Sequence, residues 1–152
     1  MTADPDAPDV AEPRAGGTVA SLLDHVAVAS RDADRTASWF ERTLGLRRAR
    51  EEVVEDAGVR LVWLYPAGRN AGGPAAATQI VQPLREGPVA RHLDEHGEGL
   101  HHVCFAVPDL ARSLDDLAES ADQVFTGGYG YPCAFLRRQP PGCAIELVER
   151  PA

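Results

Sequence analysis

Apolar and polar residues alternate along the chain with two different periods, and the switch between them predicts the order of its elements. Alternation over 22–30 indicates a strand. Apolar positions at helical spacing over 32–45 indicate a helix, with Asp32 or Asp34 as its N-cap and Gly45 at its end. The same pattern predicts three more strands, over 46–55, 59–66 and 78–84, and a short connecting helix over 88–97.

This pattern then starts again. Residues 100–120 repeat the strand–helix opening, and alignment of the two copies sets His25 against His102. Two further strands are expected over 131–139 and 143–149, on either side of a Pro-Pro-Gly turn. The duplication predicts an α+β fold in which paired βαβββ modules form a curved mixed sheet around a metal-binding cleft.

The predicted domain organisation has three parts. Residues 1–18 are rich in Ala, Pro, Asp and Gly and read as a disordered acidic N-terminal tail. Residues 19–87 make the first βαβββ module, and residues 88–152 contain the connecting helix and the second module.

Four side chains with metal-ligand chemistry occupy corresponding places in the two repeats. His25 and His102 lie on the first strand of each repeat, and Gln79 and Glu146 on the last. If the modules pack about a pseudo-twofold axis, these side chains converge on a site suited to Zn²⁺, Co²⁺, Mn²⁺, Ni²⁺ or Fe²⁺. The alternative for each histidine alone is a hydrogen-bonded core residue, and Gln79 alone could face solvent.

Composition removes several other chemistries. All 15 basic residues are arginine, so Schiff-base catalysis and a P-loop lysine are excluded. A formal net charge of −8 argues against nucleic-acid binding. No apolar run is long enough for a membrane helix, and three cysteines without a CxxC pair fit a reducing compartment, so we expect a cytoplasmic protein.

With these residues in place, the chain resembles the vicinal oxygen chelate (glyoxalase/bleomycin resistance/dioxygenase) superfamily and, within it, the methylmalonyl-CoA epimerase group. The matching pieces are LDHVAVA, WFERTLGL, QIVQPL, PVARHLDEHGEGLHHVCFAV and AFLRRQPPGCAIELVE. The resemblance implies a divalent metal ion held by His25, Gln79, His102 and Glu146.

It also implies a metal-dependent epimerase or isomerase that transfers a proton next to a carbonyl or thioester, with Glu146 as the catalytic base. An epimerase needs a second base, which the family carries on the strand after the Gly-Val turn, where this chain has Leu61. Leucine cannot move a proton. The candidates for a displaced second acid are Glu51, Glu52, Glu55, Tyr65, Tyr129 and Tyr131.

Leu61 and its neighbours also suggest an apolar substrate pocket. Its expected members are Leu61, Trp63, Tyr65, Tyr129 and Tyr131. The expected partners are a small-molecule substrate, for which the resemblance suggests an acyl-CoA, and a second copy of the chain in a homodimer, with no nucleic acid and no membrane. The arginines that flank the predicted cleft elements are Arg60, Arg85, Arg91, Arg137 and Arg138.

Two other functions fit the same scaffold. One is a glyoxalase-type lyase or a dioxygenase, although Gln79 would fill a position that oxygen-activating relatives leave open. The other is a small-molecule-binding resistance protein, against which the intact ligand set counts. The sequence identifies neither the substrate nor the native metal.

Overall fold

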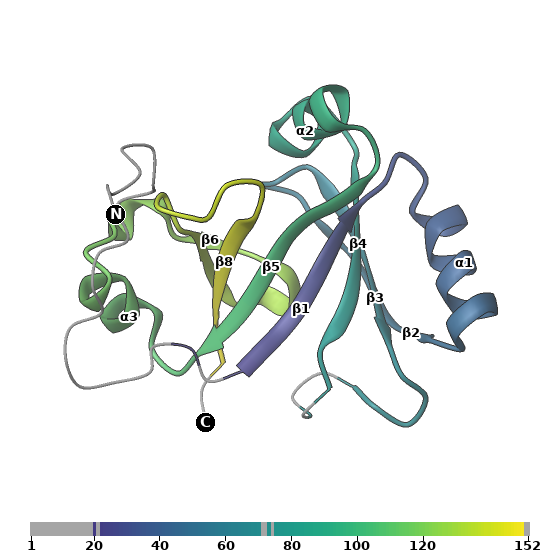
Figure 1. Ribbon diagram of the computed structural model, residues 1–152, viewed down its shortest axis with the longest axis horizontal. Coiled ribbons are helices and arrows are strands. Elements are labelled where there is room, and N and C mark those ends of the chain that lie inside the picture. The colour runs from purple at the N-terminus through teal and green to yellow at the C-terminus, as the bar shows by residue number, and fades with distance from the viewer. Residues whose placement is uncertain (1–19, 21, 71–72, 74, 151–152) are drawn as a thin grey trace, which may run out of the picture.

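The computed structural model describes residues 20, 22–70, 73 and 75–150, so the predicted tail at 1–18 lies outside the described residues. Eight strands form one sheet (Figure 1). The strands are β1 Leu22–Ala29, β2 Arg47–Val54, β3 Val59–Tyr65, β4 Ala77–Pro83, β5 Gly99–Val107, β6 Phe125–Thr126, β7 Pro132–Phe135 and β8 Ala144–Glu149. The helices are α1 Ala33–Leu44, α2 Pro88–His96 and α3 Leu110–Asp116. Helices α1 and α3 lie against the outer face of the sheet, and α2 lies at one end of the strands, next to the cleft (Figure 1).

The strand order is symmetric about the centre of the sheet. It runs β2-β3-β4-β1-β5-β8-β7-β6, with β1 and β5 antiparallel at the middle. Each of these strands pairs in parallel with the last strand of its own repeat, β4 or β8, and the outer pairs are antiparallel. The expected α+β fold with a curved mixed sheet is therefore confirmed. The division into modules at residue 87 stays a prediction.

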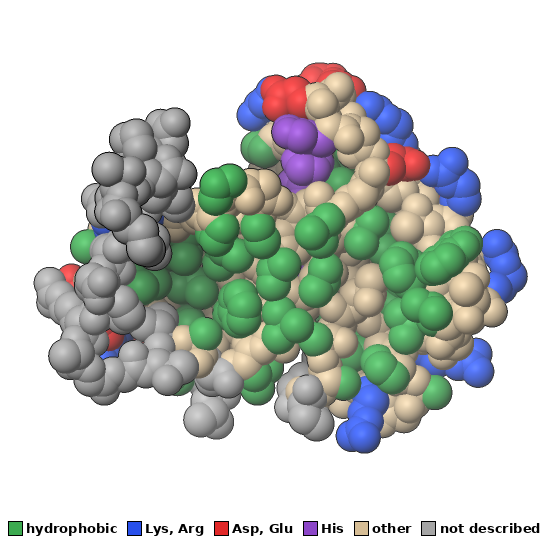
Figure 2. Space-filling model, in the orientation of Figure 1, with side chains coloured by type: hydrophobic (Ala, Val, Ile, Leu, Met, Phe, Trp, Pro, Cys, Tyr) green, Lys and Arg blue, Asp and Glu red, His purple; other side chains and the backbone are tan. Residues whose placement is uncertain are grey.

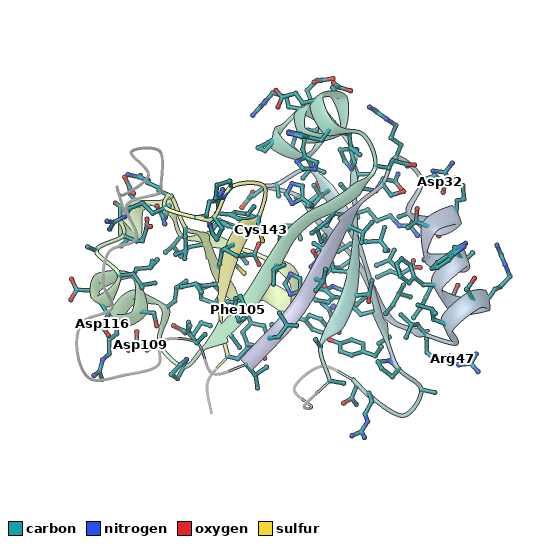
Figure 3. The ribbon with its side chains drawn as sticks, viewed as in Figure 1. Asp32, Arg47, Phe105, Asp109, Asp116 and Cys143 are labelled. Atoms are coloured by element: carbon teal, nitrogen blue, oxygen red, sulfur yellow. The ribbon has the colours of Figure 1, made fainter. Side chains whose placement is uncertain are left out.

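Helices α1 and α3 begin in the same way. Asp32 accepts a hydrogen bond from the Arg35 amide, and Asp109 accepts one from the Arg112 amide (Figure 3). Each carboxylate satisfies a backbone donor that a helix start leaves unpaired. Of the two candidate caps for α1, Asp32 is the one used, and Gly45 ends the helix in the left-handed conformation with φ 69°.

The two faces of the sheet bury different residues. The outer face packs against α1 through Val62, Leu64 and Ile80, and against α3 through a second cluster that includes Leu147. The inner face carries His25, Gln79, His102 and Glu146, all buried, together with Leu61 and Trp63. Alternation along each strand thus separates an aliphatic outer core from a chemically equipped inner face.

The second repeat departs from the predicted elements. A strand was expected over 131–139, but β7 ends at Phe135. It stops there because the amides of Arg137 and Arg138 donate to the Glu119 carboxylate instead of to a neighbouring strand. The two-residue strand β6 was not predicted. Within the described residues, no helix is long and apolar enough to cross a membrane.

Candidate metal site and cleft

The two histidines of the repeats meet across the central strand pair. His25 lies on β1 and His102 on β5, and both side chains are buried. Their Nε2 atoms are 3.1 Å apart. Two ligands bound at ~2.1 Å to one ion lie roughly 3.0–3.4 Å apart when they occupy adjacent positions. The separation therefore suits two imidazoles on a single metal ion.

Glu146 completes the group from β8. Its Oε2 lies 3.5 Å from His102 Nε2 and its Oε1 lies 3.8 Å from His25 Nε2. The ligand atoms of these three residues lie within 4.8 Å of one another. A buried carboxylate is costly without a cation or hydrogen-bond donors. Nitrogen and oxygen donors in this arrangement fit the divalent ions expected from the sequence.

Gln79 lies on β4 at the place that corresponds to Glu146 on β8. It pairs with Ala27 of β1, which is also the partner of His102 on the other side. Gln79, His102 and Glu146 all line the same cleft, while His25 packs between His102 and the indole of Trp63, at ring-centroid distances of 5.3 and 5.0 Å. The structure thus brings the four predicted ligand residues together on the inner face.

A β-bulge precedes each histidine. The β1–β5 register skips Asp24 on one strand and His101 on the other, and these two residues are equivalent in the repeat. Asp24 Oδ2 accepts a hydrogen bond from His25 at 2.7 Å, through Nδ1. His101 Nδ1 lies 2.8 Å from His102 Nδ1. Because each bulge breaks the two-residue alternation, the residue before a ligand can contact it.

These contacts orient the imidazoles. With Nδ1 of His25 donating to Asp24, the lone pair on Nε2 points toward His102 and Glu146. Arg150 holds Asp24 in turn, with Nε 2.9 Å from Oδ1. Burial works against the ionised form of Asp24, but its hydrogen bonds to His25 and Arg150 lower its pKa overall. Asp24 therefore remains a carboxylate at neutral pH.

The protonation states of the inner residues suit a ligand set. Burial holds the pKa of His102 well below its usual range, so its imidazole is neutral and can bind a metal ion. Burial also lowers the pKa of His101 to about 4. For Glu146, burial raises the pKa, and the nearby His25 acts in the opposite direction.

Two thiols that the sequence pattern did not single out lie beside the carboxylate. The Cys104 thiol donates to the Phe105 carbonyl at 3.9 Å and the Cys133 thiol to the Tyr131 carbonyl at 3.5 Å. Burial raises the pKa of both cysteines, so both thiols stay protonated beside Glu146. The strand register explains Cys104, which pairs directly with Glu146 across β5 and β8. The position of Asp24 next to His25 in the sequence was the clearest sign of a residue that supports a metal ligand. Its contact with His25 depends on the β-bulge, which the alternating pattern did not predict.

The cleft next to these residues encloses about 740 Å³. That volume is typical of small-molecule sites. Leu61 lines it. The four aromatic residues expected beside Leu61 are not among its described lining: Trp63 packs against Tyr129 at a centroid distance of 4.9 Å, and Arg150 covers the rings of Tyr129 and Tyr131. Tyr65 hydrogen-bonds to Tyr129, and burial raises its pKa.

Of the five flanking arginines, Arg85 lines the cleft, at its rim. Its guanidinium donates to the carbonyls of Glu55 and Asp56. Arg60 pairs with Asp34 on the helix side of the sheet. Arg137 and Arg138 bind the segment after α3, and Arg91 is an exposed residue of α2.

A curled eight-stranded sheet with a cleft, two histidines, a glutamine and a glutamate defines a class of protein. The model of the Glyoxalase/Bleomycin resistance protein/Dioxygenase superfamily matches residues 24–149, and the chain belongs to this superfamily. Its relatives indicate an enzyme.

Named relatives narrow the comparison. The ethylmalonyl-CoA/methylmalonyl-CoA epimerase of Cereibacter sphaeroides is 30% identical over 136 residues, which cover 84% of this chain and 96% of that protein. Human mitochondrial methylmalonyl-CoA epimerase is 28% identical over 84% of this chain and 71% of its own. A methylmalonyl-CoA epimerase solved with methylmalonyl-CoA and NH4+ superposes with a TM-score of 0.76 at 30% identity, over 88% of this chain and 96% of that one. The methylmalonyl-CoA epimerase of Mycobacterium tuberculosis superposes with a TM-score of 0.76 at 29% identity, over 90% of this chain and 92% of that one.

Proposed function

We propose that this chain is a divalent-metal-dependent enzyme that transfers a proton at the carbon next to the carbonyl of an acyl-CoA thioester. The observation that carries the proposal is the buried Glu146, whose carboxylate oxygens lie 3.5 and 3.8 Å from the facing Nε2 atoms of two histidines. The epimerase relatives support the thioester, because their named substrates are acyl-CoA esters.

Each side chain has a separate task in this proposal. His25, His102 and Gln79 hold the metal ion with Glu146, and Asp24 fixes the tautomer of His25. A bound divalent ion supplies a Lewis acid that stabilises negative charge on the thioester oxygen. Glu146 accepts the proton from the neighbouring carbon.

The experiment is a deuterium-exchange assay on protein loaded with Zn²⁺ or Co²⁺. Methylmalonyl-CoA is incubated in D₂O, and loss of the α-proton signal is followed by NMR. We expect exchange by the wild type and a loss of ~10²–10⁴-fold in Glu146→Gln. Glu41→Gln is the matched control, because Glu41 pairs with Arg48 from α1, outside the cleft. Absence of exchange by the metal-loaded wild type would refute the proposal.

The proposal extends to a homodimer. An apolar strip follows the outer face of β1 and β5, between α1 and α3, and consists of the half-buried Val26, Val28, Val103 and Phe105 (Figure 2). Chains that each carry a net charge of −8 repel one another, so an uncharged face is the one that can meet its own copy. In light scattering, Val103→Glu should give monomers, whereas Val53→Glu, at an exposed position of β2, should leave the dimer intact. A monomeric wild type would contradict this. The cytoplasmic location stays a prediction.

A further inference from the structure

The two walls of the cleft differ in their chemistry. The wall formed by β3 and β4 presents Leu61, Val59 and Val81. The other wall presents Glu146 from β8 and Phe135 from β7. An epimerase must remove a proton from one side of the reacting carbon and deliver one to the opposite side, so it needs a proton carrier on each wall.

We infer that this chain transfers the α-proton on one face only, so that it exchanges the hydrogen of one stereoisomer with retention and does not interconvert epimers. This rests on the proposed function above. It follows from the position of Leu61, which lines the cleft on the wall across from Glu146 and is 5% exposed. Leu61 also packs in a buried cluster with Val59, Val81, Trp63 and Tyr65, and no carboxylate belongs to this cluster.

The carboxylate on the strand next to Leu61, that of Glu52, is already bound by other groups. Glu52 is the cross-strand partner of Leu61 on β2, yet its Oε1 accepts from the Tyr129 amide at 2.8 Å and its Oε2 from the Trp63 indole at 3.0 Å. Arg50 pairs with the same carboxylate. Glu52 therefore fastens the 128–130 segment over Trp63, and it is not among the described residues that line the cleft.

The remaining candidates lie outside the reacting position. Glu51 is paired with Arg48 and Arg60 on the helix side of the sheet. Glu55 is exposed to solvent. Besides Glu146, the described residues that line the cleft include two carboxylates, Asp56 and Glu86, and both are exposed at its rim.

The other groups that could carry a proton are also engaged. The hydroxyl of Tyr65 is bound to that of Tyr129, away from this cleft. His101 lines the cleft, but its Nδ1 is held 2.8 Å from the Nδ1 of His102, on β5 and not on the β3–β4 wall. Within the described part of the chain, the β3–β4 wall has no group that can exchange a proton with substrate.

A single base can both remove and return the α-proton. The α-carbon C–H bond breaks, the proton forms an O–H bond on Glu146, and the electron pair moves to the thioester oxygen as an enolate. In the reverse step the enolate takes a proton or a solvent-derived deuteron from the same carboxyl group. Nothing is oxidised or reduced. Because Glu146 reaches one side of the enolate, configuration is retained.

The test separates exchange from inversion. Each resolved epimer of methylmalonyl-CoA is incubated in D₂O with metal-loaded protein; proton NMR follows exchange and circular dichroism of the thioester follows inversion. We expect exchange of one epimer, with inversion slower by ~10²–10⁴-fold. Inversion at the rate of exchange would overturn the inference while leaving the proposed function intact. Loss of all exchange would overturn both.

A gain-of-function variant tests the wall itself. Leu61→Glu places a carboxylate across from Glu146 and should raise inversion by at least ~10²-fold, whereas Leu61→Gln, of matched size, should not. Calorimetric Zn²⁺ titration and thermal melting of both variants check that fold and metal site are intact. If folded, metal-binding Leu61→Glu does not invert, the inference is wrong. If Leu61→Glu does not fold, the wild-type comparison decides.

Discussion

The hydrogen bond between Asp24 and His25 provides a quantitative test of the site. It is 2.7 Å long, and both side chains are largely removed from water, at 11% and 3% exposure. In Asp24→Asn the amide oxygen can still accept from Nδ1, but the negative charge that favours this tautomer and the basicity of Nε2 is lost. Loss of such outer contacts weakens metal binding by ~10–100-fold. We expect the lower end, about tenfold or ~1.4 kcal/mol, because one hydrogen bond survives.

The assay is calorimetric titration of Zn²⁺ into metal-free protein, with a thermal melt run in parallel. Asp24→Asn also removes the ion pair with Arg150, so its melting temperature should fall as well. Asp34→Asn is the control, since Asp34 also pairs with two arginines but lies on α1, on the other side of the sheet. Unchanged affinity in Asp24→Asn, or an equal loss in Asp34→Asn, would refute the tautomer-fixing role.

Three further outcomes are expected. Gly128→Ala should cost ~1–3 kcal/mol in denaturant unfolding, because its Cβ would lie 2.4 Å from Trp63 Cζ2 and 3.0 Å from Leu61 Cδ1. Gly87→Ala should cost less, because nothing lies near the added Cβ. The lowered pKa of Asp24 stabilises the fold at pH values above ~3.9, the pKa of an aspartate in the unfolded chain, and this stabilisation is lost as the pH falls through the lower pKa of the folded state. The melting temperature should therefore fall less steeply with decreasing pH in Asp24→Asn than in the wild type. Zn²⁺ at 100 times its Kd should stabilise the wild type against unfolding by ~2.7 kcal/mol, and chelation should reverse this. Glu146→Gln should need more Zn²⁺ for the same stabilisation. Equal responses of the two proteins would exclude Glu146 as a ligand.

Elements specified by local chemistry were predictable from the sequence. Helix α1 illustrates this, because Asp32 supplies the cap, Gly45 tolerates the left-handed turn, and the apolar spacing between them fixes the buried face. The strand after Tyr131 was predicted too long because its end depends on Glu119, a distant carboxylate that takes the amides of Arg137 and Arg138. A pattern of apolar residues contains no information about such a competitor.

The sequence by itself determined the duplicated strand–helix order and the four residues at equivalent positions of the repeats, because periodicity and residue type are local properties. Only the tertiary structure decided what surrounds them. The bulges that bring Asp24 and His101 against the histidines arise from the register between β1 and β5, and the thiols beside Glu146 come from two neighbouring strands. Likewise, the resemblance to the epimerases marked Leu61 as the position where that family carries a base. The structure added that Glu52, the cross-strand neighbour of Leu61, accepts hydrogen bonds from Trp63 and Tyr129, because folding brings these groups within hydrogen-bonding distance.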